Sequence, residues 1–129
     1  MLKGLVEESI MSMRSLLDLE TEFERVSNAL IRVLRNRGKV LLCGNGGSSA
    51  DALHMATELV CRFEKERRHL PAICLNASSS DITAMANDFS YEEVFSRALE
   101  AYSSEGDLLV VFSTSGNSGK KSSDKKSAG

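Results

Sequence analysis

Two side chains with acid–base or metal-binding chemistry, His54 and Glu58, stand four residues apart, shortly after a glycine-rich segment. In a helix this spacing puts both on one face, with Cβ atoms ~6 Å apart. Such a pair suits joint binding of a divalent metal, or a carboxylate base that the imidazole orients. The same spacing is also common in ordinary surface ion pairs, and no H-E-x-x-H pattern is present. The spacing alone leaves these alternatives open.

The glycine-rich segment reads C-G-N-G-G-S-S at residues 43–49, and we call residues 44–49 the glycine loop. Its glycines allow a sharp turn and a close approach of backbone to a ligand, and we expect Ser48 or Ser49 to cap the next helix. The N–H groups and dipole of a helix start favour an anion, most often phosphate. Tight packing would explain the same glycines. Nucleotide binding is disfavoured, because the loop is neither G-x-G-x-x-G nor a lysine-bearing Walker loop.

A second loop, S-T-S-G-N-S at residues 113–118, also follows an apolar run, and we call it the serine loop. Its hydroxyls and glycine stand where an anion could sit. Both loops follow apolar runs that do not alternate with polar residues, and helical patterns separate these runs. This arrangement predicts a parallel sheet covered on both faces, with ligands bound at the carboxyl ends of the strands. The expected strands are 40–43, 71–75 and 108–112, and the expected helices are 49–63, 80–85 and 90–102, the last opened by a capping box at Ser90.

The first 37 residues carry apolar side chains at helical spacing and predict two amphipathic helices. We expect a break near residues 18–21, because Thr21-Glu22-Phe23-Glu24 has the form of a capping box. Gly38 is the expected stop. The apolar face of such helices packs into a core or pairs with a second copy of the chain.

The composition limits the classes of protein that fit. At 129 residues, 42% hydrophobic and 26% charged, the chain predicts one small soluble domain. No apolar stretch approaches the ~18 residues of a membrane span and no secretory signal is evident, so we expect a cytoplasmic protein. The net charge of −2 gives no reason to propose nucleic acid or a membrane surface as a partner. Cys43, Cys61 and Cys74 are expected as buried small hydrophobes and His69 as a solvated loop residue.

Five motifs occur in order and resemble the sugar-isomerase (SIS) domain and, within that family, the bacterial phosphoheptose isomerases. They are C-G-N-G-G-S-S-A-D-A-L-H-M-A-T-E-L (43–59), L-P-A-I (70–73), A-N-D-F (86–89), V-F-S-R (94–97) and G-D-L-L-V-V-F-S-T-S-G-N-S (106–118). The resemblance covers about residues 1–118. It implies a three-layer α/β sandwich whose parallel sheet has the flavodoxin-like order, preceded by two helices. It also implies a cytoplasmic homotetramer.

The implied activity is the interconversion of sedoheptulose 7-phosphate and D-glycero-D-manno-heptose 7-phosphate, which supplies heptose for lipopolysaccharide. The resemblance makes Glu58 the general base and joins it to His54 in a zinc site. The implied substrate contacts, besides Glu58, are Asn45, Gly46 and Gly47, then Asn87 and Asp88 on the next loop, and Ser113, Thr114, Ser115 and Ser118 around the phosphate.

The chain departs from the family after the serine loop. Family members continue into further strands and a last helix that supplies a glutamine and a histidine to the site. Residues 119–129 are polar except Ala128, which predicts a disordered tail after an SIS domain at 1–118, with its helical segment at 1–37 and its α/β part at 38–118. We therefore expect an incomplete fold and site and a slowed isomerase. The alternative is a non-catalytic SIS module that binds a sugar phosphate or associates with the bacterial replication initiator.

Overall fold

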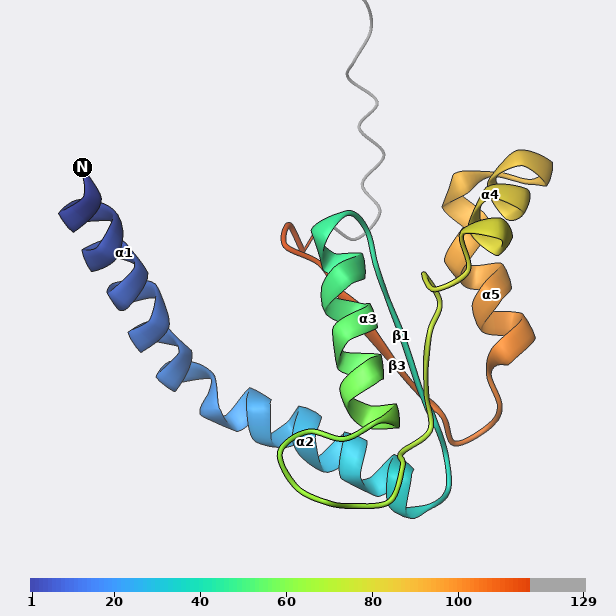
Figure 1. Cartoon of the computed structure of the whole chain (residues 1–129), viewed down its shortest axis with the longest axis horizontal. Coiled ribbons are helices and arrows are strands. Elements are labelled where there is room, and N and C mark those ends of the chain that lie inside the picture. The colour runs from blue at the N-terminus through green and yellow to red at the C-terminus, as the bar shows by residue number, and fades with distance from the viewer. Residues whose placement is uncertain (117–129) are drawn as a thin grey trace, which may run out of the picture.

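The computed structural model describes residues 1–116, in which a helical N-terminal segment precedes an α/β unit (Figure 1). The elements in chain order are α1 (Leu2–Ser15), the 3-10 turn η1 (Leu16–Leu19), α2 (Glu20–Arg35), β1 (Val40–Gly44), α3 (Gly47–Val60), β2 (Ala72–Cys74), α4 (Ser79–Asp88), the 3-10 turn η2 (Tyr91–Glu93), α5 (Val94–Tyr102) and β3 (Leu108–Phe112). Ser118 and the predicted tail at 119–129 lie outside the described residues.

The three strands form a parallel sheet in the order β2-β1-β3, with β1 in the centre. Val40 pairs with Ala72 on one side and with Leu108 on the other. The order matches the first three strands of a flavodoxin-like sheet. The prediction of a parallel sheet from three apolar runs is confirmed.

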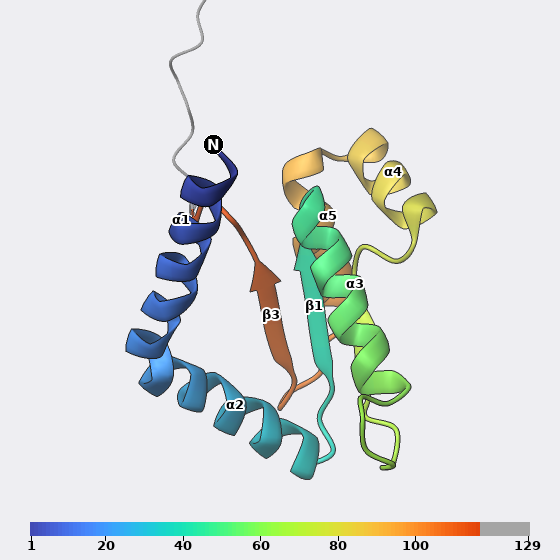
Figure 2. The same ribbon diagram turned by 60° about the vertical axis from the view of Figure 1, so that its left-hand side comes forward.

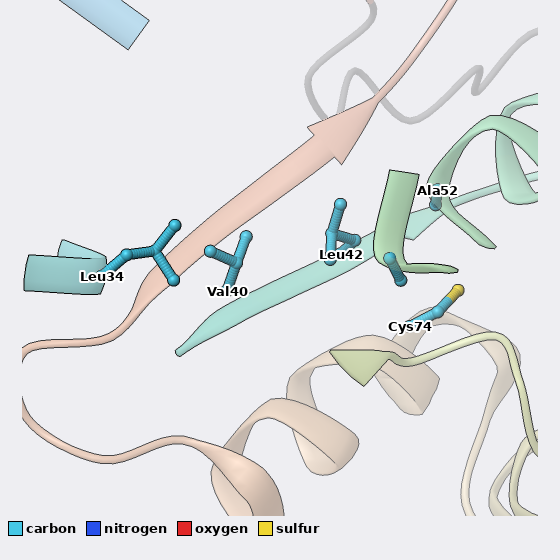
Figure 3. Packing of buried hydrophobic residues seen from close by; sticks show 6 residues of the cluster. Leu34, Val40, Leu42, Ala52 and Cys74 are labelled. Atoms are coloured by element: carbon cyan, nitrogen blue, oxygen red, sulfur yellow. The ribbon is translucent and has the colours of Figure 1, made fainter. Parts of the chain in front are cut away.

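Helices cover both faces of the sheet, because the side chains of β1 alternate between two apolar clusters. Val40 and Leu42 pack with residues of α2 and α3, whereas Leu41 and Cys43 pack with residues of α4 and α5. Figure 3 shows the first cluster, with Val40 and Leu42 between Leu34 and the side of α3 that carries Ala52. The three-layer sandwich is therefore confirmed.

β3 lies at one edge of the sheet and is covered on one face only (Figure 2). Val110 and Phe112 pack against the cluster that includes α2 and α3. On the other face, Leu109 is 41% exposed and Val111 60% exposed. Within the described residues this strand therefore presents apolar side chains to solvent.

The N-terminal helices form where expected, but their junction differs. The break is the 3-10 turn η1, two residues earlier than predicted, and α2 begins at Glu20 after Leu19 with no side-chain cap. The predicted capping box at Thr21 is therefore wrong. Thr21 already lies inside the helix, since η1 leads directly into the first turn of α2 and leaves no extended residue to act as a cap.

The C-terminus of α2 ends in a Schellman motif, in which the N–H of Gly38 donates to the carbonyl of Val33 at 2.9 Å. The left-handed position of this motif is Arg37, with φ of 63°, and not the glycine. Gly38 is required for another reason: a Cβ there would come within 2.5 Å of the carbonyl oxygen of Gly106. The prediction that the helix ends near Gly38 is confirmed, but Arg37 and not the glycine takes the left-handed conformation that ends it.

Several other boundaries shift from their predicted places. α3 begins two residues earlier and ends three residues earlier than expected. α4 begins one residue earlier than expected, where Ser78 caps it through the N–H of Asp81 at 3.2 Å, and it ends three residues later, at Asp88. At Ser90 the side chain caps no backbone N–H, and its hydroxyl lies 3.4 Å from Glu93 Oε1 instead, so the predicted capping box is wrong. A 3-10 turn then leads into α5.

The cysteines divide by environment. Cys43 and Cys74 are buried as predicted, whereas Cys61, one residue past the end of α3, is exposed, which corrects the prediction for that residue. His69 is exposed, as predicted, although its Nδ1 lies 2.7 Å from the carbonyl oxygen of Val60. None of the helices between residues 1 and 116 is long and apolar enough to cross a membrane.

Candidate functional site

The glycine loop connects β1 to α3 and depends on two glycines for different reasons. A Cβ on Gly44 would lie 2.7 Å from the backbone carbon and oxygen of Ser48, so only glycine lets the end of β1 approach the first turn of α3 this closely. Gly46 adopts φ of 57° and ψ of −126°, a conformation that other residues rarely take. The loop is thus a sharp turn from the sheet into a helix N-terminus.

The start of α3 differs from its predicted form. Gly46 is the N-cap residue, so no side chain caps the helix, and the predicted caps at Ser48 and Ser49 are wrong. Ser48 is buried, and the Ser49 hydroxyl donates back to the carbonyl of Gly46 at 2.7 Å. Both serines sit inside the first turn because the positive φ at Gly46 starts the helix early.

Asn76, two residues after the end of β2, holds the start of the glycine loop through a contact that was not predicted from the sequence. Its Oδ1 accepts from the N–H of Gly44 at 3.1 Å, and its Nδ2 donates to the carbonyl of Gly44 at 2.8 Å. The two bonds tie the end of β1 to the connection after β2. The signal was available, since a polar residue directly after an apolar run lies at the carboxyl edge of a parallel sheet.

The glycine and serine loops meet at a cleft of about 310 Å³, which we call the loop cleft. This confirms that the carboxyl ends of β1 and β3 bring the two loops together. Its lining consists of Cys43, Gly44, Asn45, Ser48, Phe95, Val111, Phe112, Ser113, Thr114 and Ser115. Four predicted substrate contacts are therefore in one place: Asn45, Ser113, Thr114 and Ser115.

The polar groups of the loop cleft are neutral. They comprise hydroxyls, one carboxamide and backbone, together with the thiol of Cys43. Burial raises the pKa of the Cys43 thiol, and the nearby Cys74 raises it further, so Cys43 stays protonated and is not an activated nucleophile. The cleft can bind an oxyanion through hydrogen-bond donors without competition from a carboxylate.

His54 and Glu58 lie together on α3, as their spacing predicted. His54 Nε2 is 3.2 Å from Glu58 Oε1, and the two side chains are 75% and 35% exposed. They line a second cavity of about 390 Å³, the helix pocket, with Asp51, Met55, Leu59, Phe63, Arg67 and Phe112. Phe112 borders both cavities, so the helix pocket adjoins the loop cleft along α3.

The loop cleft and the pair His54–Glu58 are separated along the axis of α3. At 1.5 Å per residue, His54 lies ~9 Å and Glu58 ~15 Å from Ser48. A ligand that touches both the serine loop and Glu58 must therefore extend along α3. The arrangement favours an extended ligand whose anionic group lies in the loop cleft and whose other end lies near His54 and Glu58.

Arg67 holds the far end of α3 and was also missed from the sequence. Its Nη2 donates to the carbonyl of Glu58 at 2.5 Å, and its Nη1 donates to the carbonyl of Leu59 at 3.0 Å. A cation at the C-terminus of a helix satisfies free carbonyls and opposes the negative end of the dipole. Arg67 thereby fixes the turn that carries Glu58.

The remaining predicted contacts lie elsewhere. Gly46 and Gly47 are exposed. They stand in the sequence between Asn45 and Ser48, which line the loop cleft, but they do not line it themselves. Asn87 and Asp88, expected on a loop, form the last turn of α4, where Asn87 Nδ2 donates to Asp88 Oδ1 at 3.0 Å. Both are exposed and line neither cavity. Ser118 lies outside the described residues.

The donors for a metal are limited. Over residues 1–116, no group of three or more His, Cys, Asp or Glu side chains could hold an ion. His54 and Glu58 offer one nitrogen and one oxygen, which fit two positions of a tetrahedral zinc site. The pair is therefore compatible with half of such a site.

Comparison with known proteins identifies the family to which the chain belongs. A family model of the SIS domain matches residues 7–121, and the chain belongs to the SIS domain family.

Among curated proteins, the chain is similar to two phosphoheptose isomerases. The one from Aliarcobacter butzleri is 50% identical over 100 residues, which cover 78% of this chain and 53% of that protein. The one from Halorhodospira halophila is 47% identical over 116 residues, covering 89% and 59%. The chain thus spans a little over half the length of these relatives.

Two solved structures have the same fold. A phosphoheptose isomerase from Francisella tularensis superposes with a TM-score of 0.82 at 34% identity, covering 88% of this chain and 60% of that one. The phosphoheptose isomerase from Neisseria gonorrhoeae gives 0.73 at 32% identity, covering 87% and 60%. These values place the α/β unit within the SIS fold.

Proposed function

We propose that the chain carries the sugar-phosphate site of a phosphoheptose isomerase, which interconverts sedoheptulose 7-phosphate and D-glycero-D-manno-heptose 7-phosphate. The main support is the loop cleft, where Asn45 and Ser48 of the glycine loop face the hydroxyl-bearing residues 113–115. Hydroxyl and amide donors at the N-terminus of α3 suit a phosphate. The names of the similar proteins agree with this substrate class.

Glu58 is the proposed base. It removes a proton from the hydroxyl-bearing carbon next to the substrate carbonyl, so that the C–H electron pair forms the double bond of an enediolate and the carbonyl electrons move onto the carbonyl oxygen. The hydroxyl proton of the first carbon then passes to that oxygen, the first carbon becomes the new carbonyl, and Glu58 returns its proton to the former carbonyl carbon. A carboxylate has two oxygens, so Oε1 can remain near His54 Nε2 while Oε2 carries the proton. Arg67 keeps the last turn of α3 in place and Glu58 with it.

Zinc is the proposed cofactor, with His54 and Glu58 as two of its ligands. A bound zinc ion would polarise the carbonyl of the substrate and stabilise the negative charge that develops on its oxygen. Because the described residues supply only this pair, the other ligands would have to come from elsewhere.

The test is isomerisation of sedoheptulose 7-phosphate by the whole chain, with and without zinc. Glu58→Gln should lower kcat/KM by ~10²–10⁴-fold and leave binding of the sugar phosphate nearly unchanged, because the loop cleft is intact. Glu100→Gln is the matched control, since Glu100 is an exposed helical carboxylate outside both cavities. Equal turnover by the Glu58 and Glu100 variants would remove Glu58 from the mechanism.

A non-catalytic module that binds a sugar phosphate is the second candidate. The observation in its favour is that residues 1–116 provide only two of the donors that a zinc site needs. This candidate predicts saturable binding of sedoheptulose 7-phosphate without product at any zinc concentration. Product formation that depends on Glu58 would exclude it.

We also propose that the chain forms a homo-oligomer, a tetramer by resemblance, in the cytoplasm. The support is the apolar surface of α1 and α2, where cavities of about 520 and 490 Å³ are lined largely by exposed aliphatic and aromatic side chains. The heptose phosphate made there would feed lipopolysaccharide synthesis. The molar mass in solution tests the oligomer directly.

A further inference from the structure

Tyr91 reaches the candidate site through one hydrogen bond between side chains. Its hydroxyl donates to Asn45 Oδ1 at 2.6 Å and so joins the turn η2 to the glycine loop. Asn45 lines the loop cleft, whereas Tyr91 does not. Tyr91 therefore acts on the cleft only through the carboxamide of Asn45.

This bond decides which atoms of Asn45 remain for a ligand. The oxygen of the carboxamide is occupied by Tyr91, and within residues 1–116 the Asn45 side chain makes no other hydrogen bond. Its Nδ2 amino group, with two N–H donors, is left for the cleft. Phosphate and sugar oxygens are acceptors, so a donor is the useful group. If the carboxamide turned over, its oxygen would face them instead.

The segment that carries Tyr91 is held firmly enough to serve this purpose. Val94, three residues later, is 1% exposed and anchors the start of α5 in the core. On the next turn, the Arg97 guanidinium stacks 3.4 Å above the ring of Phe89 and pairs with Glu93 at 2.7 Å. The hydroxyl of Tyr91 is thus presented by a braced turn.

We propose that Tyr91 is a positioning residue that holds the Asn45 carboxamide with Nδ2 directed toward the sugar phosphate. The proposal rests on the proposed function, since it assigns an orienting partner to a residue of the same site. It does not require Tyr91 to touch the substrate.

Tyr91→Phe removes the hydroxyl and keeps the ring. We expect the Kd and the KM for sedoheptulose 7-phosphate to rise about three- to tenfold, the effect of one neutral hydrogen bond, with kcat unchanged. Tyr102→Phe is the matched control. Tyr102 is the other tyrosine of the chain, and its hydroxyl lies 3.3 Å from Asp81 Oδ2, away from both cavities. Equal losses in the two variants would overturn the proposal.

A double-mutant cycle with Asn45→Ala separates orientation from a general effect. If Tyr91 works through Asn45, Tyr91→Phe should have no further effect on Kd in the Asn45→Ala background. An additive loss in that background would contradict the assigned role.

A measurement without ligand keeps this inference separate from the proposed function. In ¹⁵N-labelled protein, the side-chain amide resonances of Asn45 should shift in Tyr91→Phe and stay in place in Tyr102→Phe. Unshifted resonances in Tyr91→Phe overturn the orienting role even if the enzyme is active. If the wild-type chain binds no sedoheptulose 7-phosphate, the proposed function and the role toward that ligand fail, while a shift still supports the Tyr91–Asn45 contact itself.

Discussion

Gly44 is the residue on which the closeness of β1 and α3 depends. Its missing Cβ allows the first turn of α3 to lie directly over the end of the strand. Gly47, three residues later in the same loop, has open space where a Cβ would stand, and its φ lies outside the left-handed region. A side chain at position 44 would therefore clash with the backbone, whereas one at position 47 would have room.

We expect Gly44→Ala to destabilise the protein by about 1–3 kcal/mol, because the new Cβ meets the backbone of Ser48 and neither chain segment can yield cheaply. Gly47→Ala should be neutral or slightly stabilising, since alanine favours the helix more than glycine does. Urea unfolding of both variants against the wild type gives the free energies. A Gly44→Ala variant as stable as Gly47→Ala would show that the loop relaxes freely.

Predictability from sequence varied among the site residues. The meeting of His54 and Glu58 followed from their spacing on one helix, a local property. The contacts of Asn76 and Tyr91 with the glycine loop join residues 32 and 46 positions apart, and only the folded sheet brings them together. The predicted caps at Ser48 and Ser49 were wrong because the positive φ at Gly46 places the start of α3 at Gly47, before both serines.

Among the elements, the strands were predictable and the helix ends were not. Buried parallel strands are continuous apolar runs, and Val40 and Leu42, which belong to such a run, are fully buried. A capping box depends on the geometry of one turn. Thr21 lies in a helix that follows directly on the 3-10 turn η1, and Ser90 is followed by the 3-10 turn η2. Neither side chain caps a backbone N–H group.

The connections that enter β1 and β3 are joined by a nearly buried ion pair. Lys39 Nζ lies 2.5 Å from Asp107 Oδ2, and the carboxylate also accepts from the N–H groups of Lys39 and Ser104. Burial acts to raise the pKa of the Asp107 carboxyl. The hydrogen bonds from Lys39 and Ser104 and the charge of Lys39 outweigh burial, so the pKa lies below its ordinary value.

This pKa shift predicts a pH dependence of stability. Because the folded pKa of Asp107 is below that of the unfolded chain, the contribution is present above the unfolded value of ~3.9 and is lost as the pH falls through the folded pKa. Asp107→Asn should be less stable than the wild type at pH 7, and the two should converge as the pH falls below about 4.

Unfolding curves between pH 3 and pH 7 test this expectation. Glu105→Gln, which alters an exposed neighbour, serves as the control and should follow the wild type throughout. A difference between Asp107→Asn and the wild type that stays constant down to pH 3 would mean that the charge of Asp107 does not contribute.

On the scale of the whole molecule, the apolar surface is unevenly covered. The central strand is buried on both faces, whereas α1 contains no buried residue and extends away from the sheet (Figure 1). Its apolar face continues through η1 onto α2. An isolated helix of this length is marginal in water unless its apolar face is covered.

A second copy of the chain would cover that face, and Leu5→Glu tests this. Leu5 is half-exposed and lines the cavity along α1, so a carboxylate there would have to be buried unpaired in the contact. We expect light scattering to show a smaller assembly at micromolar concentration and thermal unfolding to lose its dependence on protein concentration. Ser12→Glu adds the same charge to α1 outside this cavity and should leave the assembly intact. A wild-type chain that is monomeric at every concentration, or a Leu5→Glu variant with unchanged mass, would remove the apolar face of α1 from any role in assembly.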